Sequence, residues 1–267
     1  MILSLLTDYG ENDEFVGVCH GVIRSIRPGV PIVDVTHGIA RHDVRQGAIV
    51  LRNALPYLPV GVHVAVVDPQ VGTERRAVAV RAADGRILVG PDNGVLSLAW
   101  ERAGGAVEAV DVSRSPFRLE PVSATFHGRD VFAPVAARLV AGAELLEAGE
   151  PLAADELETL DLPSASIESG AARAHALLID RYGNVALDMG HAELLELGLT
   201  IGARVEVTAP AGALEATVVR TFADVPEGEL ILYEDAWGSL ALAVNRGDAA
   251  ARTGLLIDGE VRVAPIR

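Results

Sequence analysis

The sequence has no lysine, and all 22 of its basic residues are arginine. Schiff-base catalysis and the lysine of a phosphate-binding loop both need a primary amine, so these two chemistries are excluded. The single cysteine, Cys19, excludes an intrachain disulfide framework and a metal site built from thiolates. Aromatic residues form only 4% of the chain, which leaves few rings on which nucleic acid bases could stack.

Positive charge is scarce as well, since 37 acidic residues give a formal net charge of −15. No run of basic residues interrupts this excess, and we therefore predict that the protein binds neither nucleic acid nor an anionic membrane surface. No uncharged apolar run approaches the roughly 20 residues that span a bilayer. The apolar residues 1–6 lack the basic segment that begins a signal peptide. These absences predict a cytoplasmic protein.

The first half of the chain alternates short apolar runs with segments whose apolar residues recur at helical spacing. Asp13 is expected to cap the first helix, which Pro28 ends. The predicted strands are 2–6, 30–35, 62–67, 77–80 and 87–89, and the other predicted helices are 44–55, 95–100 and 131–140. This alternation predicts a largely parallel sheet flanked by helices. We expect residues 1–165 to form this α/β domain.

The second half reads differently. Residues 145–170 are acidic, alanine-rich and without a firm period, which is typical of a linker. Short predicted strands follow at 174–179, 185–188, 204–208, 214–221, 229–233, 240–244 and 261–263. We therefore expect residues 171–267 to form an all-β domain, a small antiparallel sandwich or barrel.

Acidic residues fall where the predicted strands end, which is where open α/β sheets bind ligands. Asp8 and Asp68 follow the first and third strands, whereas Asp34 lies inside the second and is assigned a structural role. An aspartate in such a place often only caps a turn. Arg75 follows Asp68 by seven residues, so a returning loop would pair them and keep the carboxylate ionised. A loop salt bridge without a function explains this pair equally well.

His127 precedes a glycine in a loop and is hard to explain as a core residue. An imidazole there can take or give a proton near neutral pH. Asp130 is expected to cap the helix that follows. Further along, Asn184 ends a predicted hairpin turn and presents both a donor and an acceptor, which suits an amide-like or purine edge.

Four residues raise the alternative of a metal site, namely Asp34, His37, His42 and Asp43. No HxH or HExxH spacing supports it, and we predict no metal.

The chain resembles the S-adenosylmethionine hydroxide adenosyltransferases, also called S-adenosylmethionine hydrolases, which are relatives of the adenosyl fluorinase and chlorinase. The similarity runs nearly end to end, and the ordered set of motifs makes it specific. The motifs are Thr7-Asp8-Tyr9-Gly10, Asp34-Val35-Thr36-His37, Val66-Val67-Asp68-Pro69 with Val71-Gly72-Thr73 and Arg75, Gly90-Pro91-Asp92-Asn93-Gly94, Phe126-His127-Gly128-Arg129-Asp130, Gly183-Asn184 and Ala243-Val244-Asn245-Arg246-Gly247.

The resemblance implies an N-terminal α/β domain, a C-terminal β-barrel-like domain and a homotrimer with sites between adjacent subunits. It implies hydrolysis of S-adenosyl-L-methionine to adenosine and L-methionine, without a metal or another cofactor. Asp68, Arg75 and His127 match the residues that position and activate water. The residues that match ligand contacts are Asp8 for the ribose hydroxyls, Asp180 for the methionine amine, Asn184 for the adenine, Trp237 near the methionine, and Val244 and Arg246 near the adenine.

The chemistry agrees with this resemblance. Attack at the 5′ carbon of the ribose displaces a sulfonium, which leaves as a neutral thioether and needs no general acid. Water has a pKa of about 15.7 and needs a base within hydrogen-bond reach as the new bond forms. The hypothesis is that His127 and Asp68 orient and partly deprotonate the water while Arg75 fixes Asp68. Which of His127 and Asp68 accepts the proton stays open.

Three alternatives remain. A halogenase would transfer a halide to the same carbon, but Asp68 would repel the anion, and the hydroxyl-bearing halide positions of the fluorinase fall on Val71 and Gly128. A metal-dependent hydrolase would use the four residues named above and lose activity to a chelator. A non-catalytic nucleoside-binding module would leave S-adenosylmethionine unchanged.

Overall fold

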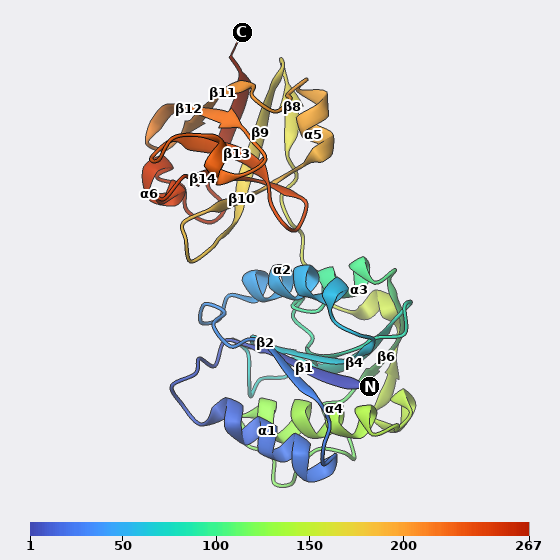
Figure 1. The fold of residues 1–267 in the computed structure, drawn as a ribbon. Helices are drawn as coiled ribbons and strands as arrows, with labels where there is room; N and C mark the ends of the chain where they lie inside the picture. Colours follow the sequence, from blue (N-terminus) through green and yellow to red (C-terminus); the bar gives the residue numbers. More distant parts are fainter. Residues whose placement is uncertain (267) are drawn as a thin grey trace. The chain divides into compact units, whose positions relative to one another are not determined.

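The computed structural model describes residues 1–266, and the chain divides into two compact units between Leu160 and Asp161. Each unit has its own hydrophobic core and is described by itself (Figure 1). Among the described residues, no helix combines the length and the apolar composition that a membrane span needs. The longest helix, α1, has 12 residues.

The first unit is built on a seven-stranded sheet with the order β2-β1-β3-β5-β4-β6-β7. The strands are β1 (Ile2–Thr7), β2 (Ile32–Thr36), β3 (Gly61–Val66), β4 (Ala77–Ala82), β5 (Ile87–Pro91), β6 (Ala106–Asp111) and β7 (Glu150–Leu152). The four strands from β2 to β5 in this order run parallel, and β4, β6 and β7 join by antiparallel pairing. This confirms the predicted largely parallel sheet. The apolar residues of the second predicted strand suggest a buried strand, but β2 lies at the edge of the sheet and exposes Asp34.

Helices cover both faces of this sheet, as predicted (Figure 1). One face packs against α1 (Phe15–Ile26) and α4 (Ala133–Val140), and the other against α2 (Val44–Ala54) and α3 (Ser97–Arg102). Asp43 caps α2, since its Oδ1 accepts the backbone N–H of Gln46 at 2.8 Å. The prediction that Asp13 caps α1 was wrong. Glu14 occupies the N-cap position there and makes no capping bond with its side chain.

Residues 145–170 form the expected linker only in part, since the two units divide inside this range, between Leu160 and Asp161. They contain the 3-10 turns η3 (Leu145–Glu147) and η4 (Ala154–Glu156), the strand β7 that pairs with β6, and β8 (Ser166–Glu168). Leu145 and Leu157 are buried in the first unit. Their spacing follows neither helical nor strand periodicity, which is why the sequence pattern did not reveal them.

The second unit is a closed barrel of seven strands in the order β10-β14-β13-β12-β11-β15-β9, and pairing of β9 with β10 closes it. The elements are β9 (Ala171–Ile179), β10 (Val185–Gly190), α5 (His191–Glu196), β11 (Arg204–Ala209), β12 (Gly212–Val218), η5 (Phe222–Asp224), β13 (Leu230–Glu234), β14 (Ser239–Val244), α6 (Ala249–Thr253) and β15 (Glu260–Pro265). The predicted barrel is confirmed, with one exception to its antiparallel pairing. β12 and β13 run parallel because a connection longer than a hairpin turn, containing η5, returns the chain before β13 starts.

Candidate active site

Two aspartates, Asp8 and Asp68, lie just beyond the carboxyl ends of neighbouring strands of the sheet. β1 and β3 are parallel neighbours, and the last residue of each strand, Thr7 and Val66, are partners in the register. Asp8 follows directly after β1, and Asp68 follows β3 after one further residue. The strand order therefore places both carboxylates at the carboxyl end of the sheet, as the sequence predicted.

Asp68 and Arg75 form a buried ion pair. Nε of Arg75 donates to Oδ1 of Asp68 at 2.9 Å and to Oδ2 at 3.1 Å, and Nη2 also donates to Oδ2. Each of the two side chains is only 5% exposed. Ion-paired contacts of this kind hold a carboxylate in one orientation. The loop that joins the pair needs Gly72, whose φ is +80° and where a Cβ would lie 2.3 Å from the carbonyl oxygen of Ala124.

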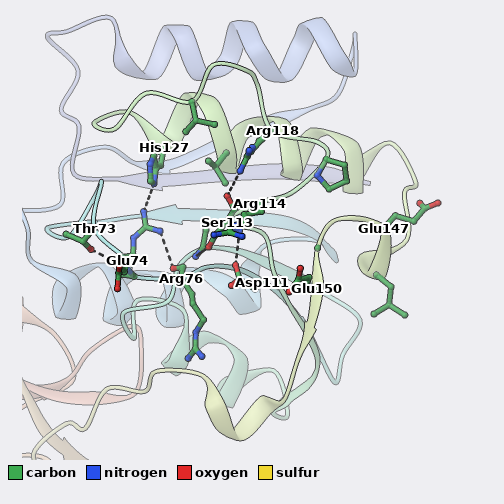
Figure 2. A pocket seen from close by; sticks show the side chains of 17 residues that line it. Thr73, Glu74, Arg76, Asp111, Ser113, Arg114, Arg118, His127, Glu147 and Glu150 are labelled. Atoms are coloured by element: carbon green, nitrogen blue, oxygen red, sulfur yellow. Dashed lines mark hydrogen bonds between the residues drawn. The ribbon is translucent and has the colours of Figure 1, made fainter.

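His127 joins this pair through the same guanidinium. Nη2 of Arg75 lies 3.1 Å from Nδ1 of His127, and the dashed line from His127 in Figure 2 marks this bond. A guanidinium only donates, so Nδ1 is the acceptor and the proton of the neutral ring sits on Nε2. Burial lowers the pKa of His127, and the charge of Arg75 lowers it further. The ring is therefore neutral near pH 7, with Nε2–H as its donor.

Asp130 stabilises the segment that carries His127, and the prediction that it caps a helix was wrong. His127 itself is the N-cap of a π-helical turn, η2 (Gly128–Phe132), and Asp130 lies inside that turn. Its carboxylate accepts the N–H of Ser123 at 2.8 Å and two bonds from Arg129 at 2.6 and 2.8 Å. Burial opposes ionisation of Asp130, but these bonds outweigh it and lower the pKa of the carboxyl. The carboxylate thereby ties the loop to the start of α4.

A cavity of about 400 Å³ opens beside this cluster, a size that suits a small ligand. Asp8, Asp68 and His127 all line it. The other lining residues are Tyr9, Asp13, Phe15, Arg41, His42, Val66, Val71, Thr125, Phe126 and Gly128. Oδ2 of Asp8 accepts the backbone N–H of His42 at 2.9 Å, which fixes the carboxylate at the rim.

Sequence reasoning did not single out the aromatic wall of this cavity. The rings of Tyr9, Phe15 and Phe126 pack against one another, with centroids 5.1 to 5.9 Å apart. Burial raises the pKa of Tyr9, so its hydroxyl stays protonated. Tyr9 and Phe126 lie in the motifs that contain Asp8 and His127. Their place beside these two residues in the sequence was the signal that could have revealed the aromatic wall.

A second cavity of about 790 Å³ is also lined by Arg75 and His127, and Figure 2 shows the side chains around it. It is larger, but its lining mixes arginines with acidic residues, among them Glu74, Asp111, Glu147 and Glu150. Arg76, which lines it, is paired with Asp92 at 2.8 Å. Neither Asp8 nor Asp68 lines this second cavity. We therefore assign the site to the smaller cavity, where both strand-end carboxylates meet the imidazole.

The barrel residues that matched ligand contacts lie at the two ends of β14. Oδ1 of Asp180 accepts the backbone N–H of Asn184 at 3.0 Å, and Oδ2 accepts the Asn184 side-chain amide at 2.7 Å. This turn needs Gly183, because a Cβ there would lie 2.2 Å from the carboxylate of Asp248. The register pairs Val185 with Leu242. The Asp180–Asn184 turn therefore lies at the end of β14 that carries Val244.

Arg246 follows at that same end in the left-handed region, with φ +56°, and its Nη1 lies 3.3 Å from Glu227. Trp237 lies in the hairpin before β14, at the opposite end of the strand, and is 49% exposed. A strand of six residues separates the two ends by roughly 20 Å. The structure thus groups Asp180, Asn184, Val244 and Arg246 and sets Trp237 apart from them.

The four residues considered for a metal do not all come together. Asp43 caps α2, and the backbone of His42 binds Asp8. Asp34 and His37 lie close to a third residue, His20 of α1, which no sequence motif singled out. The sequence alone does not say which face of α1 turns toward β2.

Comparisons with known proteins agree with this site and fold. Residues 3–149 match the N-terminal domain of the S-adenosylmethionine hydroxide adenosyltransferases, and residues 174–262 match their C-terminal domain. A Salinispora tropica protein named (R)-S-adenosyl-L-methionine hydrolase is 46% identical over 261 residues, which cover 98% of this chain and 97% of that protein. A fluorinase from Actinoplanes sp. (strain N902-109) is more distant, at 31% identity, with 93% of this chain and 92% of that protein covered.

The fold is also shared with a solved structure. The crystal structure of an uncharacterized conserved protein from Thermotoga maritima matches with a TM-score of 0.93 and 33% identity. The match covers 98% of this chain and 100% of that chain. Sequence and structure comparisons therefore agree over nearly the whole chain.

Proposed function

This chain belongs to the S-adenosylmethionine hydroxide adenosyltransferase family, and from that membership we propose that it hydrolyses S-adenosyl-L-methionine to adenosine and L-methionine. One structural observation supports the assignment of this reaction to particular residues. Asp68 and His127, both bonded to Arg75, line one cavity together with Asp8. In this proposal Asp8 binds the ribose hydroxyls, and the other three residues hold the attacking water.

The geometry divides the work on the water between Asp68 and His127. Because Nδ1 of His127 accepts from Arg75, the ring has only Nε2–H left, and that group donates to the water oxygen. The carboxylate of Asp68, held by Arg75, accepts a proton from the water. His127 therefore positions the nucleophile, and Asp68 is the base. We infer this assignment of the base from the hydrogen bond between Arg75 and His127.

In the proposed step, the water oxygen attacks the 5′ carbon of the ribose and forms the new carbon–oxygen bond. The electron pair of the carbon–sulfur bond goes to sulfur, so the sulfonium leaves as the neutral thioether of methionine. One water proton passes to Asp68 and then to solvent, and the other remains in the 5′-hydroxyl of adenosine. A carboxylate is a weak base, so proton transfer accompanies bond formation and contributes roughly 10²–10⁴-fold. Holding the water in line with the breaking bond lowers the barrier further.

Halide transfer, the main alternative, fits the cavity poorly. The carboxylate of Asp68 lines it and repels an anion. A serine at position 128 would not fit in the present arrangement, because a Cβ there would lie 2.1 Å from the hydroxyl oxygen of Tyr9. The position that carries a hydroxyl in the fluorinase is thus filled here by Tyr9.

Several finer statements stay predictions that rest on the family resemblance. They are a homotrimeric active form with sites between adjacent subunits, contacts of Asp180, Asn184, Trp237, Val244 and Arg246 with the ligand, and a reaction without a metal or other cofactor. A cytoplasmic location also stays a prediction, and it rests on the sequence composition. Light scattering of the purified protein tests the trimer directly, because a monomeric, fully active enzyme would contradict it.

Product analysis in oxygen-18-labelled water, with chloride present, tests the reaction. We expect adenosine labelled at its 5′-hydroxyl, unlabelled L-methionine and no chlorinated nucleoside, with the same kcat after treatment with a chelator. Unlabelled adenosine would contradict direct attack at the 5′ carbon. A chlorinated nucleoside would favour the halogenase, a kcat lost to the chelator would favour the metal-dependent hydrolase, and unchanged substrate would favour the binding module.

A further inference from the structure

Three side chains with metal-ligating atoms meet outside the cavity, between α1 and β2. His20, Asp34 and His37 each offer one ligand atom, and these atoms all lie within 4.8 Å of one another. Nε2 of His20 is 2.9 Å from Oδ1 of Asp34, and Nε2 of His37 is 3.1 Å from the same oxygen. The residues that line the 400 Å³ cavity do not include any of the three. The proposed reaction therefore leaves this cluster unused.

The ring of His37 carries the argument for a ligand. Its side chain is only 5% exposed, yet among the described residues Nε2 has no hydrogen-bond partner. It lies near the Asp34 oxygen, but not in the geometry of a hydrogen bond. A buried polar atom without a hydrogen-bond partner destabilises the folded protein. A cation bound between Nε2 and the carboxylate would satisfy both atoms.

The other nitrogen of this ring is already held. Nδ1 of His37 lies 2.8 Å from Oγ1 of Thr7. When Nδ1–H donates to that hydroxyl oxygen, the lone pair of the ring is on Nε2 and faces Asp34 and His20. A metal-ligating histidine almost always has such an outer partner, which fixes its tautomer and its orientation.

We propose that His20, Asp34 and His37 bind a divalent transition-metal ion of the Zn²⁺ type. Zn²⁺ binds imidazole nitrogen and carboxylate oxygen at about 2.0–2.2 Å, so tetrahedral ligand atoms lie roughly 3.3 Å apart. The observed 2.9 and 3.1 Å need to widen by only a few tenths of an ångström. Two imidazoles with one carboxylate favour such an ion over Mg²⁺ or Ca²⁺, which prefer oxygen ligands.

The site is accessible and leaves room for water. The side chains of His20 and Asp34 are 25% and 40% exposed, so an ion can reach them from solvent and keep a water as its fourth ligand. Its effect would extend to the first loop of the sheet. Oγ1 of Thr7 accepts the N–H of Tyr9 at 3.2 Å, and the carbonyl of His37 accepts the N–H of Gly10 at 2.8 Å. The ion is a structural tether for residues 7–10, and it stands independently of the proposed reaction.

Metal analysis of the full-length, tag-free protein tests this proposal. The protein is stripped with a chelator, equilibrated with Zn²⁺, passed through a desalting column and analysed for zinc per chain. We expect one zinc, a higher Tm, and slower hydrogen exchange at the amides of Tyr9 and Gly10. Absence of stoichiometric zinc in the folded, reloaded protein would overturn the proposal.

Three variants and a control assign the ligands. His20→Ala and Asp34→Asn are the primary variants because both residues are partly exposed and leave the core intact. Loss of an outer partner weakens metal binding by roughly 10–100-fold. Each primary variant is expected to weaken zinc binding by more than this, and Thr7→Val is expected to weaken it by about this amount. His175→Ala is the control, since it breaks another His–Asp contact, 2.8 Å from Nδ1 to Asp188. Equal zinc binding by His20→Ala and the wild type, or equal loss in the control, would overturn the assignment.

Discussion

The guanidinium of Arg75 donates to Nδ1 of His127 at 3.1 Å while it also holds the carboxylate of Asp68. One cation therefore sets the tautomer of the imidazole and the orientation of the carboxylate. Protonation of His127 would place a second cation against Arg75 and break this bond.

The first prediction concerns pH. Burial and Arg75 lower the pKa of His127, so activity stays constant near neutral pH and falls only below the ordinary histidine value of 6.5. Arg75→Gln removes one of these two causes and is expected to move the acid limb of kcat/KM to higher pH, besides lowering the rate. The pH profile and an NMR titration of the His127 ring check this. An acid limb that stays in place would show that Arg75 does not set the protonation of His127.

The second prediction separates a donor from a base. A glutamine at position 127 can accept from Arg75 and donate to water, whereas alanine can do neither. His127→Ala is expected to lower kcat by roughly 10–100-fold, the equivalent of a lost hydrogen bond. His127→Gln is expected to recover part of that loss. Asp68→Asn removes the base and is expected to cost roughly 10²–10⁴-fold.

The two possible assignments of the base predict different results for these variants. If Asp68→Asn remained active and His127→Gln were as inactive as His127→Ala, the imidazole would be the base. Binding of S-adenosylmethionine by calorimetry serves as the control, because the affinity of Asp68→Asn is expected to change less than its kcat.

The third prediction concerns Gly128. In Gly128→Ser the new Cβ would lie 2.1 Å from the hydroxyl oxygen of Tyr9, so the tyrosine must move. We expect a loss of about 1–3 kcal/mol in the free energy of unfolding, weaker adenosine binding and no chlorinated product. Gly21→Ala is the matched control, because it faces open space in α1 and is expected to stabilise the protein by about 0.5–1 kcal/mol. Chlorination by Gly128→Ser would mean that the cavity accepts a halide despite Asp68.

The fourth prediction concerns acid stability and His63, a buried residue of β3 bonded to Ser4 at 2.8 Å. Burial lowers its pKa from 6.5 to about 4. Between these values the unfolded chain binds the proton and the folded one does not, so stability is lost as the pH falls from about 6.5 toward 4. The loss through this group is about 3 kcal/mol.

Urea unfolding near pH 7.5 and near pH 4.5 measures this effect. The difference between the two pH values is expected to shrink in His63→Gln and to persist in His191→Gln, whose ring is largely exposed. An unchanged difference in His63→Gln would assign the acid sensitivity to other groups.

Much of the fold could be predicted because the spacing of apolar residues in the sequence indicates which side chains are buried. β3 is buried along its whole length and alternates with amphipathic helices, and the sequence shows both. The spacing from Asp68 to Arg75 also showed that a loop could return. The same reasoning failed for Asp13 and Asp130, because a cap depends on which residue begins the helix.

The features that could not be predicted from the sequence depend on how helices, strands and loops contact one another in the fold. Asp130 binds a loop that precedes it by seven residues, and His20 meets Asp34 only after α1 packs beside β2. The parallel pairing of β12 with β13 depends on the path of a long connection. The local pattern of apolar and polar residues in the sequence gives no information about these contacts and pairings.

The closure of the barrel by β9 and β10 has a consequence for self-association. The closed barrel itself offers no row of unpaired backbone groups. Among the described strands, the outer ones are β8, a three-residue strand that pairs with β9 alone, and β2 and β7 at the two edges of the first unit's sheet. β7 is three residues long and contains Pro151, which cannot donate to a neighbouring strand. β2 carries Asp34 at its centre, and a charge there discourages a second chain from adding a strand. The carboxylate that we assign to an ion thus also protects the longer of the two edges of this sheet from aggregation.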